Sequence, residues 1–376
     1  MSSVLVALLV LAAVLGPDVA PHNPYLVKRL QWIDGELRKA PFPPSALYPL
    51  ETDDLGRDQL SLLPYGARVT LVMAFVAAIV RLLVGLVLGT VVGWWPGSLF
   101  DGAVTALTDF LAAIPGLLLA MLVLFAVGIR RGQVAFIVAL SLVGWREITQ
   151  IVRGHVLIIR NKFYILAARA VGLSPAEILS RHVLPDLLAT RLALAALEMG
   201  GVLLLLGELG FLHVSIGGGR IGFNLTTQEV RHYFNVPDWR AMLGSSWRWF
   251  RSYPWFPLAP ALAFFVAILG FNLFGHGLQR FVDRGGFHPS GWSVLPFLLV
   301  VTLVLLGARA LLENTGIEAQ FARLACQFDV SRAWDDTDYL TQPGVGGTAH
   351  RPRRGVQGRC LHRLSIRAGR IDPHHA

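Results

Sequence analysis

The chain has 376 residues, of which 54% are hydrophobic and 15% are charged, and its mean hydropathy is +0.56. This composition is typical of an integral membrane protein rather than of a soluble domain. The net charge of +9 does not indicate a nucleic-acid partner, because seven arginines after Thr348 face a single acid, Asp372, and so supply six of the nine charges. The two cysteines, Cys326 and Cys360, provide no disulfide framework.

Seven apolar segments approach or reach the roughly 20 residues that cross a bilayer as a helix. They are Val4–Gly16, Val69–Trp95, Ala103–Gly128, Val134–Trp145, Leu187–Leu212, Trp255–Leu278 and Val294–Leu312. The first begins almost at the initiator Met and lacks the basic start and cleavage site of a signal peptide, so we expect a first span, within residues 1–16, whose start is clipped. The fourth is short and is expected to continue as helix beyond Arg146. These segments predict an all-α, polytopic helical bundle.

The domain organisation follows from these spans. We expect an external loop at 17–68, a transmembrane core at 69–285 with a cytoplasmic loop at 146–186, and an additional span at 293–312. Orientation follows from the Lys and Arg residues near the spans. Six bases face three acids in the 146–186 loop, whereas six bases face seven acids in the 17–68 loop. The 146–186 loop is therefore predicted to be cytoplasmic and the 17–68 loop external.

The cytoplasmic loop contains the stretch "YILAARAVGLSPAEILSRHVLPD", Tyr164 to Asp186. A helix is expected over Phe163–Val171, with Gly172 as its left-handed C-terminal stop. Ser174 is placed to cap a second helix, with Pro175 at its first position and Glu177 closing a capping box. Leu173 and Ile178 have the spacing of a hydrophobic staple, and Pro185 is expected to interrupt the helix before the next span. The pattern predicts a rigid helical hairpin, either a lever for a cytoplasmic partner or an idle surface element.

The hairpin also carries a resemblance. "AARAVG", followed after nine residues by "HVLP", resembles the EAA loop of binding-protein-dependent ABC importer permeases. The resemblance implies that the 163–185 hairpin couples the permease to a separate ATPase. The residues carried over by position, or capping the hairpin, are Ala167, Ala168, Gly172, Ser174, Glu177, Leu184 and Pro185. The leading glutamate of the family pattern is Leu166 here.

A second stretch narrows the resemblance. "TDDLGRDQLSLLPYGARVTL", Thr52 to Leu71, is similar to the segment before the second span in C-type permeases of dipeptide, oligopeptide and nickel importers, although Glu51 and Pro64 depart from that pattern. "LAAIPGLLLA", "GWREITQIVRG", "DWRAML" and "FNLFGHGLQRFVD" follow in the expected order. The resemblance implies a plasma-membrane permease with a homologous second permease, two cytoplasmic ATPase subunits and an extracytoplasmic solute-binding protein.

The chain shows no motif for chemistry of its own. It contains no G-x-x-x-x-G-K-[ST] phosphate loop, no H-E-x-x-H and no G-x-S-x-G. We therefore expect a non-enzymatic subunit without a cofactor, with ATP and Mg²⁺ bound by the partner ATPases.

Charged residues within the spans predict a polar lining of the translocation path or structural pairs between helices. They are Arg81, Asp109, Glu198 and Glu208. Each would be costly facing lipid and is expected to face the bundle interior, a cavity or another charge. Asp109 and Glu198 are both candidate partners of Arg81.

The tail, 313–376, is rich in Arg, His, Gly and Pro and is predicted to be disordered. Its stretch Phe328–Gly347 resembles the lead-in of secreted zinc aminopeptidases, as a truncated or frameshifted fused peptidase would. Two alternatives to the importer therefore stay open: an ion- or proton-coupled secondary transporter, and the membrane anchor of a truncated peptidase fusion. The former predicts inverted repeats, and the sequence shows no convincing one.

Overall fold

The computed structural model describes residues 2–22, 28, 30–33, 36–214, 220–224, 229–233, 237–246 and 249–283. All structural statements concern these residues. The expected seventh span, Val294–Leu312, and the tail with its resemblance to peptidases lie outside them.

The described chain is mostly helical, which confirms the predicted all-α bundle. Its helices are α1 (Ser2–Val19), α2 (Gln59–Trp94), α3 (Leu99–Ala112), α4 (Gly116–Val127), α5 (Gln133–Arg160), α6 (Phe163–Ala170), α7 (Pro175–Ile178), α8 (Leu184–Phe211), α9 (Trp239–Ser246) and α10 (Trp255–Asp283). A 3-10 turn, η1 (Ile129–Arg131), precedes α5, and a π-helical turn, η2 (Leu179–Val183), precedes α8. Two antiparallel strand pairs are β1 (Leu30–Ile33) with β2 (Glu36–Lys39), and β3 (Arg220–Asn224) with β4 (Glu229–Tyr233).

Four of the described helices, α2, α5, α8 and α10, are long and apolar enough to cross a membrane. The bent pair α3–α4 makes a fifth if it is counted as one broken span, and α1 is a shorter apolar helix. As expected, the helix that begins near Val134 continues beyond Arg146 and ends at Arg160.

The segment Ala103–Gly128 is not the continuous helix that its length predicted. Helix α3 ends at Ala112 and α4 begins at Gly116, and their axes differ by 101°. Pro115 stands at the N-cap of α4, where its missing N–H costs no helical hydrogen bond, and the residue before a proline is disfavoured in the helical conformation. The proline therefore separates two helices.

Helix α2 begins at Gln59, ten residues before the apolar segment that starts at Val69. The reason is local: the Asp58 side chain accepts hydrogen bonds from the backbone N–H groups of Leu60 and Ser61, which caps the helix. The His22 ring and the Ser61 hydroxyl also contact this carboxylate.

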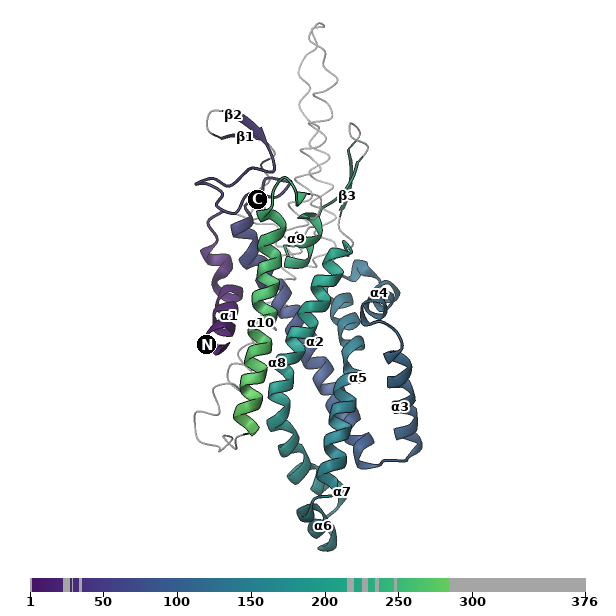
Figure 1. Cartoon of the computed structure of the whole chain (residues 1–376). Coiled ribbons are helices and arrows are strands. Elements are labelled where there is room, and N and C mark those ends of the chain that lie inside the picture. The colour runs from purple at the N-terminus through teal and green to yellow at the C-terminus, as the bar shows by residue number, and fades with distance from the viewer. Residues whose placement is uncertain are drawn as a thin grey trace, which may run out of the picture. The chain divides into compact units, whose positions relative to one another are not determined.

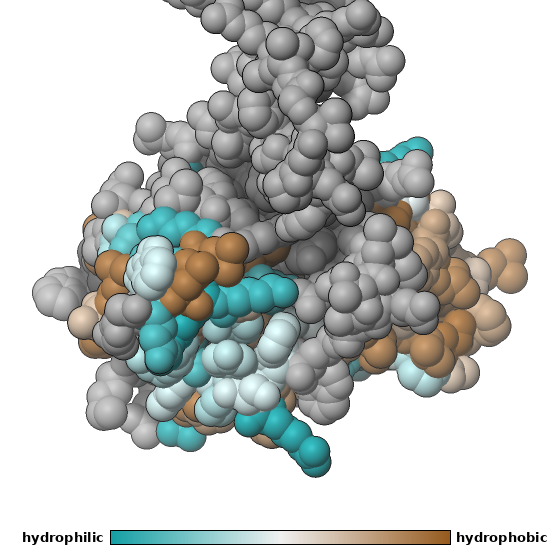
Figure 2. All heavy atoms as spheres, turned by 90° about the horizontal axis from the view of Figure 1, so that it is seen from above, coloured by the Kyte–Doolittle hydropathy of each residue, from teal (hydrophilic) through white to brown (hydrophobic). Residues whose placement is uncertain are grey.

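The bundle has two ends (Figure 1). The hairpin end carries α6, α7 and η2, which together form the helical hairpin, residues 163–183. The loop end carries β1–β2, residues 40–58 and α9. In the view onto the loop end, hydrophilic and apolar side chains are intermixed (Figure 2), and the exposed apolar residues of β1 and β2 are Leu30, Trp32 and Leu37.

Buried local bonds and long-range contacts to α10 hold the segment 51–59 at the loop end. Asp53 and Arg57 form a buried ion pair of 2.6 Å, and Asp53 also accepts the backbone N–H groups of Leu55 and Arg57. The Gln59 amide donates to the carbonyl of Phe256 at the start of α10 (2.6 Å), and Glu51 accepts a backbone hydrogen bond from the same residue. The segment thus fastens α2 to α10.

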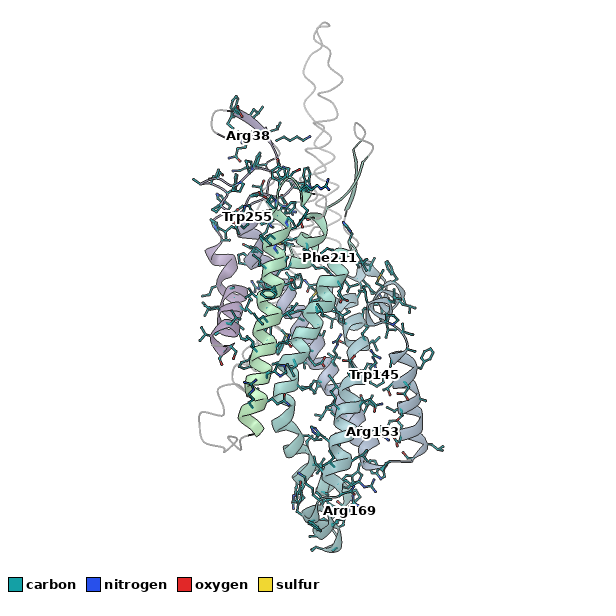
Figure 3. The ribbon with its side chains drawn as sticks, in the orientation of Figure 1. Arg38, Trp145, Arg153, Arg169, Phe211 and Trp255 are labelled. Carbon is teal, nitrogen blue, oxygen red and sulfur yellow. The ribbon has the colours of Figure 1, made fainter. Side chains whose placement is uncertain are left out.

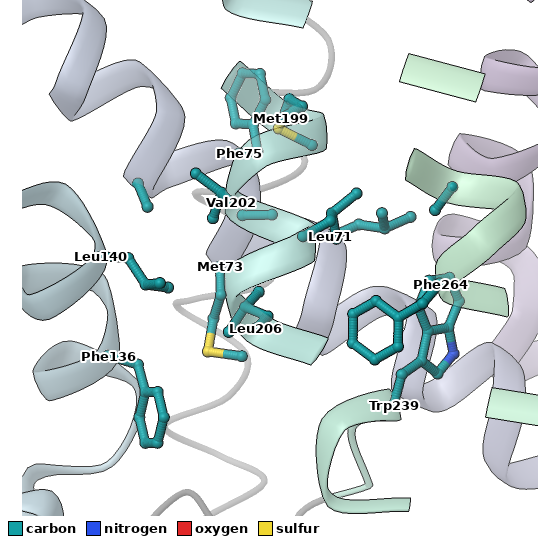
Figure 4. Packing of buried hydrophobic residues seen from close by; sticks show 14 of the residues in the cluster. Leu71, Met73, Phe75, Phe136, Leu140, Met199, Val202, Leu206, Trp239 and Phe264 are labelled. Atoms are coloured by element: carbon teal, nitrogen blue, oxygen red, sulfur yellow. The ribbon is translucent and has the colours of Figure 1, made fainter. Parts of the chain in front are cut away.

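The main core lies where α2, α5 and α8 meet, and α1, α9 and α10 add to it. Within it α5 packs mainly on α2, and α8 packs mainly on α10. Figure 4 shows part of this cluster, with Leu71, Met73, Phe75, Phe136, Leu140, Met199, Val202, Leu206, Trp239 and Phe264 labelled. The Trp239 and Phe264 rings meet edge to face at 5.7 Å, so α9 is anchored on α10.

Candidate functional site

The helical hairpin follows α5 directly and leads directly into α8. Its first helix, α6, ends in a Schellman motif: the N–H of Gly172 bonds to the Arg169 carbonyl (3.0 Å), and that of Leu173 bonds to the Ala168 carbonyl (3.1 Å). This geometry needs a left-handed residue, and Gly172 has φ +89°. A Cβ at Gly172 would meet nothing within 4 Å, so backbone conformation alone explains the glycine.

The second helix, α7, begins with the predicted capping box. The Ser174 hydroxyl accepts the N–H of Glu177 (3.3 Å), and the Glu177 carboxylate accepts the N–H of Ser174 (2.9 Å). Pro175 occupies the first turn of this helix. The backbone N–H and then the hydroxyl of Ser174 stabilise the ionised carboxylate, which lowers the pKa of Glu177 below its usual value. The turn is therefore fixed by local bonds although it is exposed to solvent.

The hairpin is fixed to the bundle by an apolar cluster. Ile165, Ile178 and Val183 are fully buried, and they pack in one cluster with residues of α5 and with Trp94 at the end of α2. The α5 members are Ile148, Val152, Val156 and Ile159. Leu173 packs against the same cluster, as expected for a staple with Ile178, and the Arg169 guanidinium lies 4.7 Å from the Trp94 ring. A force on the hairpin would therefore reach α2 and α5.

The outer surface of the hairpin is apolar. Phe163 and Val171 are 91% and 85% exposed, and Tyr164 and Leu166 are also exposed. Large apolar side chains that protrude together from a rigid element mark an interaction surface. Among the predicted coupling residues, Ala167, Gly172, Ser174, Glu177 and Leu184 are exposed, and Ala168 is half-buried.

Pro185 does not interrupt the helix, contrary to the prediction. The chain stays helical from Pro175 to Phe211, because η2 changes the hydrogen-bond register just before the proline: the N–H of Leu184 bonds to the carbonyl of Leu179. In such a π-helical turn the hydrogen-bond pattern is already shifted, so the missing N–H of Pro185 does not break the helix. Hairpin and α8 are thus continuous.

The four charged residues predicted in the spans separate into two groups. The side chains of Arg81 and Glu198 are 4% and 12% exposed, and the Arg81 Nη1 lies 3.3 Å from the Glu198 Oε2. Of the two candidate partners of Arg81, the structure therefore selects Glu198. Asp109 on α3 and Glu208 on α8 are exposed. Neither of them points into the interior of this chain, and for Asp109 the reason is that α3 lies at the edge of the bundle (Figure 1).

A sequence model of the family described as "Binding-protein-dependent transport system inner membrane component" matches residues 85–286, which is more than half of the chain. The chain belongs to this family. The match covers the last ten residues of α2 and all later described helices, including the whole helical hairpin, but not Arg81. The expected resemblance to binding-protein-dependent permeases and the multi-pass inner-membrane location are thereby confirmed.

Three relatives show which permeases the chain is similar to. The dipeptide transport system permease protein DppC of Alkalihalophilus pseudofirmus is 30% identical over 240 residues, 64% of this chain and 73% of the relative. The oligopeptide transport system permease protein OppC of Bacillus subtilis is 27% identical over 280 residues, 74% and 83% of the two chains. The glutathione transport system permease protein GsiD of Escherichia coli O6:K15:H31 is 32% identical over 244 residues, 64% and 73%. These relatives are transport permeases.

Two interhelical contacts of the permease escaped the sequence analysis. A Cβ at Gly85, Gly89 or Gly93 would lie within 3 Å of an atom of α5, so the three glycines let α2 and α5 approach closely. The signal was present in "GLVLGTVVG", whose glycines recur every four residues on one helix face. Asp101 on α3 forms a bidentate pair with Arg153 on α5, at 2.9 and 3.1 Å. Arg153 is labelled in Figure 3. The two residues are 52 positions apart, so no local sequence pattern indicates this pair.

Proposed function

We propose that this permease imports peptides as one transmembrane subunit of an ATP-driven complex, together with a homologous permease, two cytoplasmic ATPase subunits and an extracytoplasmic solute-binding protein. Family membership and relatives named for dipeptide, oligopeptide and glutathione transport support the substrate class. The family match favours this function over a secondary transporter. ATP and Mg²⁺ would be bound by the ATPase subunits.

The structure of the helical hairpin is the observation that supports the coupling role. It has two capped short helices, buried apolar side chains that pack on α5, and an exposed apolar surface that includes Phe163 and Val171. A rigid protrusion with an apolar tip suits insertion into a groove of an ATPase subunit. This assignment places the hairpin end in the cytoplasm and the loop end towards the solute-binding protein.

The test removes exposed apolar area at one end of the molecule at a time. The variant Phe163→Ser with Val171→Ser should insert and fold normally, because both side chains are exposed, but should fail to co-purify with the ATPase subunits. The control variant Trp32→Ser with Leu37→Ser removes exposed apolar area at the loop end and should retain the ATPase. Equal ATPase retention by both variants would contradict the coupling role.

The substrate class is tested on the whole complex in proteoliposomes. ATP-dependent uptake of labelled di- and tripeptides is expected, and it should require the solute-binding protein. A complex that hydrolyses ATP in response to its binding protein but accumulates no peptide would refute the peptide assignment.

A further inference from the structure

Arg81 connects three membrane-spanning helices through one guanidinium group. Its Nε donates to the Leu140 carbonyl of α5 at 2.7 Å, and its Nη1 contacts the Glu198 carboxylate of α8 at 3.3 Å. Arg81 itself belongs to α2. The two helices that it joins to α2, α5 and α8, are those that enter and leave the helical hairpin.

The space for this contact comes from a glycine. A Cβ at Gly144 on α5 would lie 2.4 Å from both the Nε and the Cζ of Arg81. A Cβ at this position would therefore displace the guanidinium from its contacts with Leu140 and Glu198. The sequence of α5 therefore accommodates the arginine one turn beyond the carbonyl that it binds.

Arg81 lies between two helix pairs, and each pair approaches closely at glycines. Gly85, Gly89 and Gly93 of α2 face α5, and Gly200 of α8 faces Asn272 of α10. Thus α5 is held mainly by α2, and α8 mainly by α10. The Arg81–Glu198 ion pair bridges the two helix pairs inside the membrane.

Stability alone does not account for this ion pair. Removing two charges from water is costly, and an apolar pair of similar volume is often as stable or more stable. The contact to Glu198 is a single one, and the Nη2 of Arg81 has no hydrogen-bond partner among the described residues. The desolvation cost is therefore offset only in part.

We propose that Arg81 is a positioning residue that ties α5 to α8. These two helices, which precede and follow the helical hairpin, would then move together when an ATPase subunit displaces the hairpin. Because a guanidinium can serve two acceptors in fixed directions, it constrains the helices more than apolar contact does. The inference rests on the proposed function, and it concerns the number of substrate molecules moved per ATP rather than folding.

The experiment compares Arg81→Met, Glu198→Leu and the double variant in the whole reconstituted complex. Arg81→Met leaves a buried carboxylate without its partner and should lower the thermal unfolding temperature, and the double variant should recover it. The double variant should still assemble and hydrolyse ATP, but its uptake per ATP should fall at least about fivefold, the lower range of ordinary coupling between sites. Wild-type uptake per ATP in the stable double variant would overturn the proposal. Arg81→Lys, which can reach only one of the two acceptors, should give an intermediate value.

A second measurement on the assembled complex does not depend on the substrate. Spin labels are placed at Gly154 of α5 and Gly201 of α8, where an added Cβ atom would meet nothing within 4 Å, after Cys326 and Cys360 have been replaced. We expect one narrow distance distribution with wild-type Arg81 and Glu198 and a broader one in the double variant. Identical distributions would overturn the proposal, whereas absent peptide uptake by the wild-type complex would refute only the peptide assignment.

Discussion

Each end of the permease has a carboxylate at the start of a helix, Glu177 or Glu51, and the pKa values of the two are shifted in opposite directions. At the hairpin end Glu177 is exposed, and hydrogen bonds from Ser174 lower the pKa of its carboxyl group. At the loop end Glu51 is 2% exposed, and burial raises the pKa of its carboxyl group more than the backbone bond from Phe256 lowers it. The turn of the hairpin is fixed by bonds between near neighbours, and the hairpin leaves its outer surface open to a partner. The loop end is held by the buried Asp53–Arg57 ion pair and by long-range contacts to α10, and it contributes to stability.

The largest effect on stability is expected at the loop end. Arg57→Ala would leave Asp53 as a buried carboxylate without its counter-ion, which costs about 3–5 kcal/mol. The control is Arg38→Ala, whose partner Glu36 is exposed and whose loss should cost less than about 1 kcal/mol. Thermal unfolding of the purified protein in detergent compares the two. Similar costs would show that the buried pair does not hold the loop end.

A smaller loss of stability with a larger loss of coupling is expected at Gly172. Gly172→Val forces a β-branched residue to φ +89°, a strain of about 1–3 kcal/mol that would redirect α7. The variant should insert but lose ATPase co-purification. Gly172→Asn is the matched control, because asparagine tolerates the left-handed conformation, and it should retain the ATPase. Retention of the ATPase by Gly172→Val would contradict the lever role.

Removal of the Ser174 cap should reduce the stability by less than Gly172→Val does. Ser174→Ala loses the capping box and is expected to cost about 1 kcal/mol. Because the pKa of Glu177 is lowered in the folded protein, its contribution is present above its ordinary value of 4.5 and is lost as the pH falls through the folded pKa. The difference between wild type and Ser174→Ala should therefore narrow in acid, where the bond from the Ser174 hydroxyl to the carboxylate is lost, but should not vanish, because the Glu177 N–H still donates to that hydroxyl. A difference that stays constant down to low pH would contradict this account.

The smallest effect is expected at Glu51 and has the opposite pH dependence. Because the pKa of Glu51 is raised on folding, its contribution is full below 4.5 and is lost as the pH rises through the folded pKa. Glu51→Gln removes the buried charge and keeps an acceptor for the Phe256 N–H, so it should be more stable than wild type at neutral pH. This advantage should disappear in acid, and an advantage independent of pH would exclude ionisation as its cause.

The sequence by itself determined the helical hairpin and the positions of the long spans. Gly172, Ser174 and Glu177 act on neighbours no more than three residues away, so their spacing is sufficient to define the turn. Length and apolar content similarly indicated α2, α8 and α10, because a bilayer imposes both on any helix that crosses it. The apolar part of α5 is shorter, and this helix was expected from its continuation beyond Arg146.

Only the tertiary structure decided how these spans are joined. Arg81 and Glu198 are separated by 117 residues, and no local pattern favours Glu198 over Asp109. The 101° bend before Pro115 removes Asp109 from the interior, and the close approach of α2 to α5 depends on where three glycines meet another helix. Backbone capping is a short-range interaction that a sequence shows directly, whereas the pairing of buried charges depends on which helix faces are brought together, and packing of the whole bundle determines that.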